Sequence, residues 1–378
     1  MQPHGPFSAR LTNLHASPIR EILSVIDRPG MVSFAGGLPA VETFPVLSAD
    51  VIPLAQLQYG PSEGDSELRE AVAGNLRSIG LECSMEQILI LSGSQQGIDL
   101  VAKLFIDAGT PVALESPTYL AALQVFRFFG ADFLAFDPGK AGAAWPSRAQ
   151  PAFVYAIPTF QNPTGRCYSA VEREALRQFC DERLVTLFED DPYRDLVYDH
   201  CDRTPVCARL QRASWIYQGS FSKRLAPGLR LGFLAASPKL VPYLTRLKQA
   251  ADLHSNRISQ WLVLQQLRAA DRGERLGGVV AVYRRKRDYF ASALERHLGN
   301  LATWQLPPGG LFFWLTLARH MDTRTLLPEA IERGVAFMPG EPFYPHMPKS
   351  SGALRLNFSH ASEENTERGL AILAELLR

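Results

Sequence analysis

The sequence of 378 residues has no long hydrophobic run and few cysteines. No segment approaches the roughly 18 apolar residues of a membrane span, and the opening stretch MQPHGPFSARL lacks the apolar core of a signal peptide. The cysteines are odd in number and scattered without a C-x-x-C pair, so neither a disulfide framework nor a zinc site is expected. We therefore expect a cytoplasmic protein with no membrane partner and no bound metal. The cysteines are Cys83, Cys167, Cys180, Cys201 and Cys207.

The chain also lacks an excess of charge of either sign. It contains 39 Lys and Arg against 38 Asp and Glu, which gives a formal net charge of +1. A protein that binds nucleic acid needs a cationic surplus on some face, so no nucleic-acid partner is expected. The densest basic run, YRRKRDYF at 283–290, is short, and we interpret it as the exposed side of a helix.

Internal repeats and low-complexity linkers are absent as well, whereas apolar residues make up 46% of the chain, a globular composition. Between about residues 64 and 236, short apolar runs alternate with segments of helical spacing, as in ILILSG followed by SQQGIDLVAKLFID. This alternation predicts a mostly parallel sheet covered by helices on both faces. A long helical stretch over 238–298 follows, and then a few strands between helices.

The predicted fold class is therefore α/β, with a large domain on a mostly parallel sheet and a smaller α+β domain. We place an N-terminal arm and helix at 1–44, the large domain at 45–262 and the small domain at 263–378. The helix of the arm is expected over 17–30, where Ser17 is the candidate N-cap and a Pro-Gly pair ends it. In open α/β sheets the ligand lies beyond the carboxyl ends of the strands, and several polar motifs here follow strands.

One stretch, YQGSFSKRLAPGLRLGF at 217–233, combines many cations with a tight turn between strand-like runs. Like charges gathered in a partly buried turn indicate that an anion binds among them. Arg224 we interpret as pointing to solvent, outside this group. The stretch contains Ser220, Ser222, Lys223, Arg224 and Arg230.

Five motifs, in this order along the chain, resemble the signatures of fold-type I, pyridoxal-phosphate-dependent class I aminotransferases. They are LSGSQQGIDLVAKLF, IPTFQNPTG, EDDPYRDLVY, SFSKRLAPGLRLGF and LRLNFS. The resemblance covers nearly the whole chain and is closer to the kynurenine/2-aminoadipate aminotransferase branch, which is also found fused in MocR-type regulators. It implies a large-domain sheet of the seven-stranded type, pyridoxal 5'-phosphate as cofactor, and transfer of an amino group from an L-α-amino acid to a 2-oxo acid.

The resemblance also implies which residues hold the cofactor. Lys223 is the lysine that bonds to it covalently, and desolvation and a cationic neighbour lower the pKa of such a lysine so that it can act as nucleophile and then as acid–base. By the D-x-x-Y spacing, Asp190 pairs with the pyridine nitrogen and Tyr193 with the ring hydroxyl, which Asn162 also binds. The other expected cofactor contacts are Ser94, Gln95, Tyr119 stacked on the ring, Ser220, Ser222, Arg230, and Tyr59 from the neighbouring subunit.

Substrate contacts follow from the same resemblance. Arg355 in LRLNFS is expected to clamp the α-carboxylate, which Asn162 also touches, and the backbone at Gly37 lines the pocket. Arg20, in the IRE context, is placed to meet a distal carboxylate, and an exposed helical arginine is the equal alternative. Tyr59 implies a homodimer with shared active sites. The expected donors are aromatic, 2-aminoadipate-like or branched-chain amino acids, with 2-oxoglutarate as acceptor and pyruvate still open.

Two other functions stay open at this point. One is a lyase or decarboxylase on the same scaffold, which product analysis would separate from a transaminase. The other is a regulatory module that binds the cofactor without turnover. The complete set of catalytic motifs and the lack of a winged-helix segment before residue 17 favour the transaminase.

Overall fold

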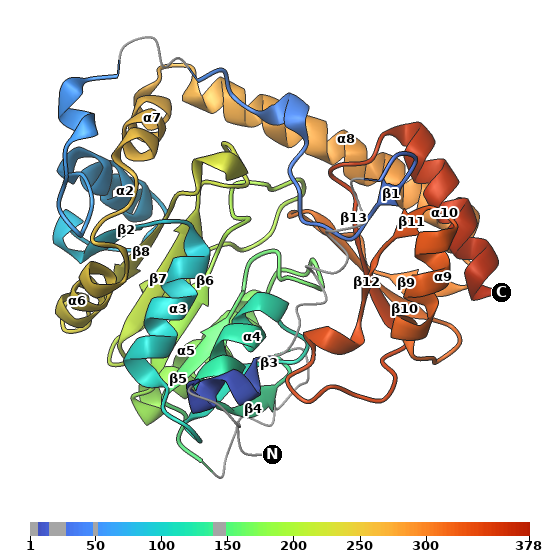
Figure 1. Ribbon diagram of the computed structural model, residues 1–378, viewed down its shortest axis with the longest axis horizontal. Coiled ribbons are helices and arrows are strands. Elements are labelled where there is room, and N and C mark those ends of the chain that lie inside the picture. The colour runs from blue at the N-terminus through green and yellow to red at the C-terminus, as the bar shows by residue number, and fades with distance from the viewer. Residues whose placement is uncertain (1–6, 15–27, 48–51, 139–148) are drawn as a thin grey trace.

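The computed structural model describes residues 7–14, 28–47, 52–138 and 149–378 (Figure 1). Arg20 and nearly all of the helix expected over 17–30 lie outside the described residues. The described residues contain three sheets, one of seven strands, one of four and one of two. Within the described residues, no helix is both long enough and apolar enough to cross a membrane.

The seven-stranded sheet confirms the predicted large, mostly parallel sheet. Strand β8 is antiparallel to both of its neighbours, and all other pairs are parallel. Helices cover both faces, so the strands are apolar on both sides and their sequences form continuous apolar runs. In spatial order the strands are β2 (Ile88–Leu91), β8 (Gly232–Ala236), β7 (Trp215–Ser220), β6 (Thr186–Asp190), β5 (Phe153–Ala156), β3 (Pro111–Glu115) and β4 (Asp132–Phe136).

The helices of the large sheet divide between its two faces because successive strand residues point in opposite directions. In β6, for example, Leu187 packs into one core and Phe188 into the other. The first face carries α2 (Ser66–Ser78), α5 (Ala170–Arg183) and α7 (Arg257–Arg268). The second face carries α3 (Ser94–Phe105), α4 (Leu120–Phe129) and α6 (Val241–Asp252).

The four-stranded sheet is antiparallel and belongs to the C-terminal part of the chain (Figure 1). The N-terminal segment joins this part, because β1 (Val32–Ser33) pairs in parallel with β11 (Val335–Ala336). The domain bounds at residues 44 and 262 stay predictions. The strands are β12 (Met338–Pro339), β13 (Ala353–Asn357), β10 (Phe312–Leu317) and β9 (Ala302–Trp304), and the helices are α8 (Arg272–Leu298), α9 (Leu327–Glu332) and α10 (Glu363–Leu377).

The long helical stretch expected over 238–298 is helical in the structure, and it is divided into three helices, α6, α7 and α8. Leu253 ends α6 with a left-handed φ of 63°, and the Asn256 side chain caps α7 by accepting from the backbone N–H of Ser259. The basic run at 283–290 is also only partly exposed. Tyr283, Arg287 and Phe290 are buried in it, and Arg287 forms an ion pair with Asp199.

Candidate active site

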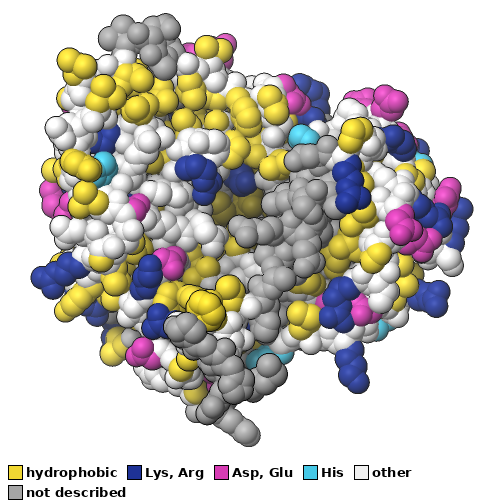
Figure 2. Space-filling model, in the orientation of Figure 1, with side chains coloured by type: hydrophobic (Ala, Val, Ile, Leu, Met, Phe, Trp, Pro, Cys, Tyr) yellow, Lys and Arg dark blue, Asp and Glu magenta, His cyan; other side chains and the backbone are white. Residues whose placement is uncertain are grey.

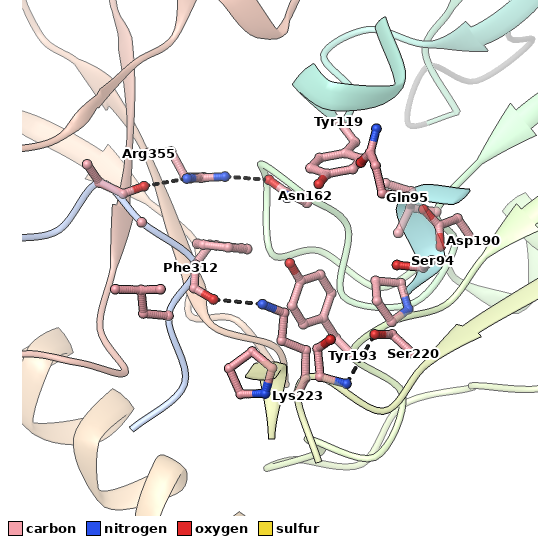
Figure 3. Close-up of a pocket in the computed structure, with 18 of the residues that line it drawn as sticks. Ser94, Gln95, Tyr119, Asn162, Asp190, Tyr193, Ser220, Lys223, Phe312 and Arg355 are labelled. Atoms are coloured by element: carbon pink, nitrogen blue, oxygen red, sulfur yellow. Dashed lines mark hydrogen bonds between the residues drawn. The ribbon is translucent and has the colours of Figure 1, made fainter. Parts of the chain in front are cut away.

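A cavity of about 380 Å³ lies where the carboxyl ends of the large-sheet strands face the four-stranded sheet. Strand β6 ends there at Asp190 and β7 at Ser220, while Phe312 and Arg355 reach it from β10 and β13 (Figure 3). The site therefore combines side chains from both sheets. Its charged lining residues are three cations and one acid, namely Lys223, Arg230, Arg355 and Asp190.

One end of the cavity is built to bind an anion. Ser94 begins α3, so the unpaired N–H groups of the first helical turn and the positive end of the helix dipole lie at the cavity. The guanidinium of Arg230 lies against Gly93, where a Cβ would come within 2.5 Å of Nη2. A Cβ on Gly232 would come within 2.9 Å of the Ser94 nitrogen. The two glycines thus allow an arginine and a helix N-terminus to meet, which is a cradle suited to a phosphate.

Lys223 lies in the cavity, and it has no acidic partner among the residues that the structure describes. Its Nζ donates a hydrogen bond to the carbonyl oxygen of Gly37 at 2.7 Å (Figure 3). Burial, together with the charges of Arg355 and Arg230, lowers the pKa of Lys223 to about 8. A lysine at its reference pKa of about 10.4 is almost wholly protonated at neutral pH, whereas one near 8 is neutral in about one molecule in ten at pH 7. This amine is therefore a usable nucleophile and base.

Asp190 is a buried carboxylate held by two neutral donors. The Tyr155 hydroxyl donates to Oδ2 at 2.7 Å, and Gln218 Nε2 donates to Oδ1 at 2.9 Å. Burial raises the pKa of Asp190 to about 6, against the effect of these two hydrogen bonds, and the nearby charge of Asp191 adds to the increase. A protonated ring nitrogen would give this carboxylate the cation that its hydrogen-bond partners do not supply.

The other two acids of the EDD run serve the fold. Glu189 is fully buried and accepts from the backbone N–H of Cys207. Asp191 accepts from the hydroxyl of Tyr217 at 2.8 Å and forms an ion pair with Arg194 at 3.1 Å. Only Asp190 lines the cavity, as the D-x-x-Y spacing predicted.

Arg355 is a buried cation whose hydrogen-bond partners are neutral. Its Nη1 donates to Asn162 Oδ1 at 2.8 Å and its Nη2 to the carbonyl oxygen of Ala35 at 2.6 Å (Figure 3). The guanidinium carbon lies 4.2 Å from the ring centroid of Phe312, and Nε is buried without a hydrogen-bond partner. Burial lowers the pKa of Arg355 to about 10. A carboxylate bound in the cavity would give this guanidinium the negatively charged partner that its neutral contacts do not provide.

Two tyrosines complete the wall between these groups. Burial raises the pKa of Tyr119 to about 12 and that of Tyr193 still further, so both are neutral hydroxyls. Tyr193 hydrogen bonds to Asn162, and its ring meets Phe312 edge-on at 5.7 Å. Neutral hydroxyls here can donate to an oxygen of a bound ring.

Most residues predicted from the sequence do line this one cavity. Tyr59 does not, because its side chain is 75% exposed and packs against His254 outside the cavity. Arg224 is not a lining residue of this cavity, as expected, but the expectation that it points to solvent is wrong, since it pairs with Asp195 at 2.8 Å and covers the ring of Phe221. The predicted residues that line the cavity are Gly37, Ser94, Gln95, Tyr119, Asn162, Asp190, Tyr193, Ser220, Ser222, Lys223, Arg230 and Arg355.

Sequence reasoning missed three residues that position the site, Tyr155, Gln218 and Phe312. Gln218 is a buried amide in an otherwise apolar strand, and it lies beside Asp190 in the parallel register of β6 and β7. A buried polar residue in a central strand is a signal that could have identified it. Phe312 carries no such signal, because one phenylalanine among many apolar residues predicts only a core position.

A family model described as "Aminotransferase class I and II" matches residues 55–373. The chain belongs to the class I and II aminotransferases. The 2-aminoadipate transaminase of Thermus thermophilus is 39% identical to it, over 97% of this chain and 94% of that protein. The aromatic-amino-acid aminotransferase 1 of Thermococcus litoralis is 35% identical, over 98% and 94% of the two chains.

A solved structure agrees with this aminotransferase fold. The Thermus thermophilus α-aminoadipate aminotransferase, in complex with N-(5'-phosphopyridoxyl)-L-leucine, matches with a TM-score of 0.86 at 36% identity, over 98% of this chain and 97% of that one. The predicted family, fold and pyridoxal phosphate cofactor are confirmed, and the protein is a transaminase. The cavity fits the cofactor, since it offers a phosphate cradle, a buried acid for the ring nitrogen and a partly neutral lysine.

We expect the raised pKa of Asp190 to make the affinity of this aminotransferase for its cofactor depend on pH. Only the carboxylate form attracts a protonated ring nitrogen, so the affinity of the apoenzyme for pyridoxal phosphate should fall as the pH drops through about 6. At pH 8, Asp190→Asn should bind the cofactor about 10–100-fold more weakly, since a hydrogen bond to a charged group contributes about 1.5–3 kcal/mol. Equilibrium dialysis between pH 5 and 8 measures both effects.

The Asp190→Asn variant is also the control for this profile. The cofactor phosphate titrates near pH 6 as well, and the variant profile contains that contribution alone. A wild-type profile parallel to that of Asp190→Asn would contradict the role of Asp190.

Proposed function

We propose that this transaminase moves the amino group of an aromatic, 2-aminoadipate-like or branched-chain L-amino acid to 2-oxoglutarate. The observation that carries the proposal is the setting of Lys223. Within the described part of the chain its amine has no acidic partner, and it is affected by the charges of two guanidiniums, Arg230 beside the helix N-terminus and Arg355 on the opposite sheet. A molecule with a phosphate at one end and an amino-acid carboxylate at the other matches this arrangement.

The proposed cofactor contacts follow from the positions described above. Bound pyridoxal phosphate supplies an electron-withdrawing ring that stabilises negative charge at the substrate Cα. Asp190 would hold a proton at the ring nitrogen, Tyr193 and Asn162 would donate to the ring hydroxyl, and Tyr119 would cover the ring. The phosphate would be held by Ser94, Gln95, Ser220, Ser222 and Arg230.

Arg355 and Lys223 would act on the substrate. Arg355 would bind the α-carboxylate through its two terminal nitrogens, with Asn162 beside it and the backbone at Gly37 as the facing wall. This contact retains the carboxylate and leaves the Cα–H bond to react, which favours transamination over decarboxylation. Lys223, with a pKa of about 8, would take the Cα proton and return it, because a base with a pKa near the working pH is the most effective.

The donor classes are supported by the apolar part of the cavity and by the relatives. Ile157, Leu38 and Phe312 line it and would accommodate aromatic or branched side chains. The relatives named above act, by their names, on 2-aminoadipate and on aromatic amino acids. Arg20 stays a prediction for donors with a distal carboxylate.

A donor screen tests the proposed substrates. The cofactor-loaded protein is mixed with 2-oxoglutarate and single L-amino acids, and glutamate formation is measured. We expect the highest kcat/KM for a donor of the three proposed classes, and Arg20→Ala should raise KM mainly for dicarboxylic donors. Release of carbon dioxide, or no glutamate from any donor, would overturn the proposal. An equal effect of Arg20→Ala on aromatic donors would make Arg20 an ordinary helical arginine.

We also propose a homodimer in which Tyr59 serves the neighbouring active site. Tyr59 is 75% exposed and lies outside the cavity of its own chain. Its segment is nevertheless held in place, because Arg257 donates to the carbonyl oxygens of Gln58 and Tyr59 at 3.2 and 3.3 Å. Leu54 and Leu57 beside it are 83% and 63% exposed, and Figure 2 shows hydrophobic side chains gathered over this part of the surface. A second copy would cover these side chains.

Mixed dimers can show that Tyr59 acts across subunits. Tyr59→Phe should weaken both sites of a homodimer by removing one phosphate contact, and Lys223→Ala should inactivate both. In a heterodimer of the two variants, one site would combine an intact Lys223 with the intact Tyr59 of the other subunit. That site should have wild-type affinity for the cofactor, measured by titration of the refolded mixture. If Tyr59 acts within its own chain, no heterodimer site regains that affinity.

We further propose a cytoplasmic location, because all five cysteines are free thiols, as expected in a reducing compartment.

A further inference from the structure

Two thiols from different loops meet beside the active-site loop. Cys167 lies in the segment between β5 and α5 that also carries Asn162, and Cys201 lies in the segment that follows β6. Both are half-buried against the core of the C-terminal part, and the sulfur of Cys167 lies 3.3 Å from the carbonyl oxygen of Asp202, the residue next to Cys201. Segments separated in the sequence thus bring two free thiols close together.

The surroundings of this pair shift the pKa values of the two thiols in opposite directions. Arg173, which is fully buried, donates from Nη2 to the sulfur of Cys167 at 3.4 Å. The neighbouring thiol of Cys201 and then the charge of Arg173 lower the pKa of Cys167, although burial opposes them. The proximity of Cys167, with burial, raises the pKa of Cys201. When Cys167 is protonated, its thiol donates a hydrogen bond to the carbonyl oxygen of Asp202, with 3.3 Å between the sulfur and the oxygen.

The other three cysteines are a contrast within the same chain. Cys83, Cys180 and Cys207 are buried, and burial raises the pKa of each thiol, that of Cys83 to about 11. Thiols of this kind react slowly with oxidants, because the thiolate is the nucleophile. A metal site is not the reason for the pair, since no group of three or more metal-binding side chains occurs among the described residues.

We propose that Cys167 and Cys201 form a reversible oxidation site, which a hydroperoxide such as hydrogen peroxide converts into a disulfide. The Cys167 thiolate attacks a peroxide oxygen, the O–O bond breaks, and the products are a sulfenic acid on Cys167 and hydroxide. Cys201 then attacks that sulfur, an S–S bond forms, and the S–O bond breaks. The hydroxyl group leaves as hydroxide, and the proton of Cys201 and one from solvent convert the two hydroxides into water. The two sulfurs lose two electrons, and the peroxide gains them.

The disulfide would join two segments that Arg173 already connects. Arg173 donates to the carbonyl oxygen of Pro158 at 2.9 Å and to that of Thr204 at 3.1 Å. The oxidised site would therefore form with little rearrangement around Asn162. The chemistry depends only on the two thiols, so its failure would leave the proposed transaminase roles untouched.

Peptide mapping of the cofactor-loaded enzyme tests the site. Trypsin places the two cysteines on separate peptides, 167–173 and 195–203. After treatment with hydrogen peroxide and alkylation of the remaining thiols, we expect these two peptides to be linked and to separate again with dithiothreitol. Before oxidation, iodoacetamide should label Cys167 about tenfold or more faster than Cys83, because labelling follows thiolate content.

Two variants make the test specific. In Cys201→Ser, the linked peptides should be missing, and Cys167 should proceed to a sulfinic acid, because it has lost the thiol that resolves it. Cys83→Ser should give the same linked pair as the wild type. Oxidation of Cys83, Cys180 or Cys207 before Cys167, or a sulfinic acid on Cys167 in the wild type without a linked pair, would overturn the proposal.

Discussion

Replacement of Lys223 by alanine is expected to reduce kcat for transamination about 10²–10⁴-fold, the usual effect of losing an acid–base group, and loss of the covalent contact should add to it. The physical reason is the lowered pKa of Lys223, about 8, which makes its amine available near neutral pH. The measurement is glutamate formation at saturating donor and 2-oxoglutarate. The phosphate cradle and Asp190 remain in the variant, so it should still bind pyridoxal phosphate, although more weakly.

A second buried lysine provides the matched control. Lys248 is fully buried, but its Nζ is paired with Asp252 at 2.8 Å and does not line the cavity. Lys248→Met should leave kcat near the wild-type value while lowering Tm, since it leaves Asp252 without its partner. Borohydride reduction of the holoenzyme should attach the cofactor to Lys223 in the wild type and in Lys248→Met. Attachment to any other lysine would contradict the assignment.

Replacement of Arg355 by methionine should lower kcat/KM about 10²–10³-fold for every amino donor. Removal of one partner from a buried charge pair costs about 2–5 kcal/mol, and each 1.4 kcal/mol corresponds to a factor of ten. Cofactor affinity should change little, because the proposed phosphate contacts lie at the other end of the cavity. Steady-state kinetics with several donors and a cofactor titration measure the two effects separately.

Arg355→Lys tests whether substrate binding needs the planar guanidinium group as well as the positive charge. A lysine keeps the cation but cannot hold both carboxylate oxygens in the same way, so its kcat/KM should lie between those of the wild type and of Arg355→Met. The free protein should not be destabilised by Arg355→Met, because the burial that lowers the pKa of Arg355 to about 10 opposes its charge. An unchanged kcat/KM in Arg355→Met would remove Arg355 from the substrate site.

The fold could be predicted where the hydrophobic pattern of a short segment matches the burial of that segment in the folded protein. Apolar runs such as ILIL at 88–91 are buried on both faces of the sheet, so the pattern and the burial have the same cause. The breaks within the helical stretch at 238–298 were not predicted, because helical spacing continues across positions where only the backbone shows a break, such as Leu253 with its positive φ. The buried Arg287 in the basic run depends on Asp199, which is distant in the sequence, and local charge does not indicate it.

The residues of the site also differ in whether their role could be predicted from the local sequence. The residues that we propose to contact the cofactor or the substrate, such as Lys223, Asp190 and Arg355, occur in motifs that can be recognised in the sequence. Those that position them do not, because Tyr155 and Gln218 reach Asp190 only through the register of neighbouring strands. Arg224 was misread for a related reason, since its partner Asp195 comes from another loop.

The short segment after β1 has a consequence for how the two halves of the enzyme respond to ligands. Its backbone accepts from Arg355 at Ala35, from Lys223 at Gly37 and, at 2.6 Å, from the hydroxyl of Ser359 at Leu38. Arg355 and Ser359 belong to the C-terminal part and Lys223 to the large one, so three carbonyl groups within residues 35–38 hydrogen bond to both parts. A carboxylate that binds Arg355, or an aldehyde that bonds to Lys223, would replace the hydrogen bond to Ala35 or to Gly37, so we expect a ligand at either residue to change how this segment is held.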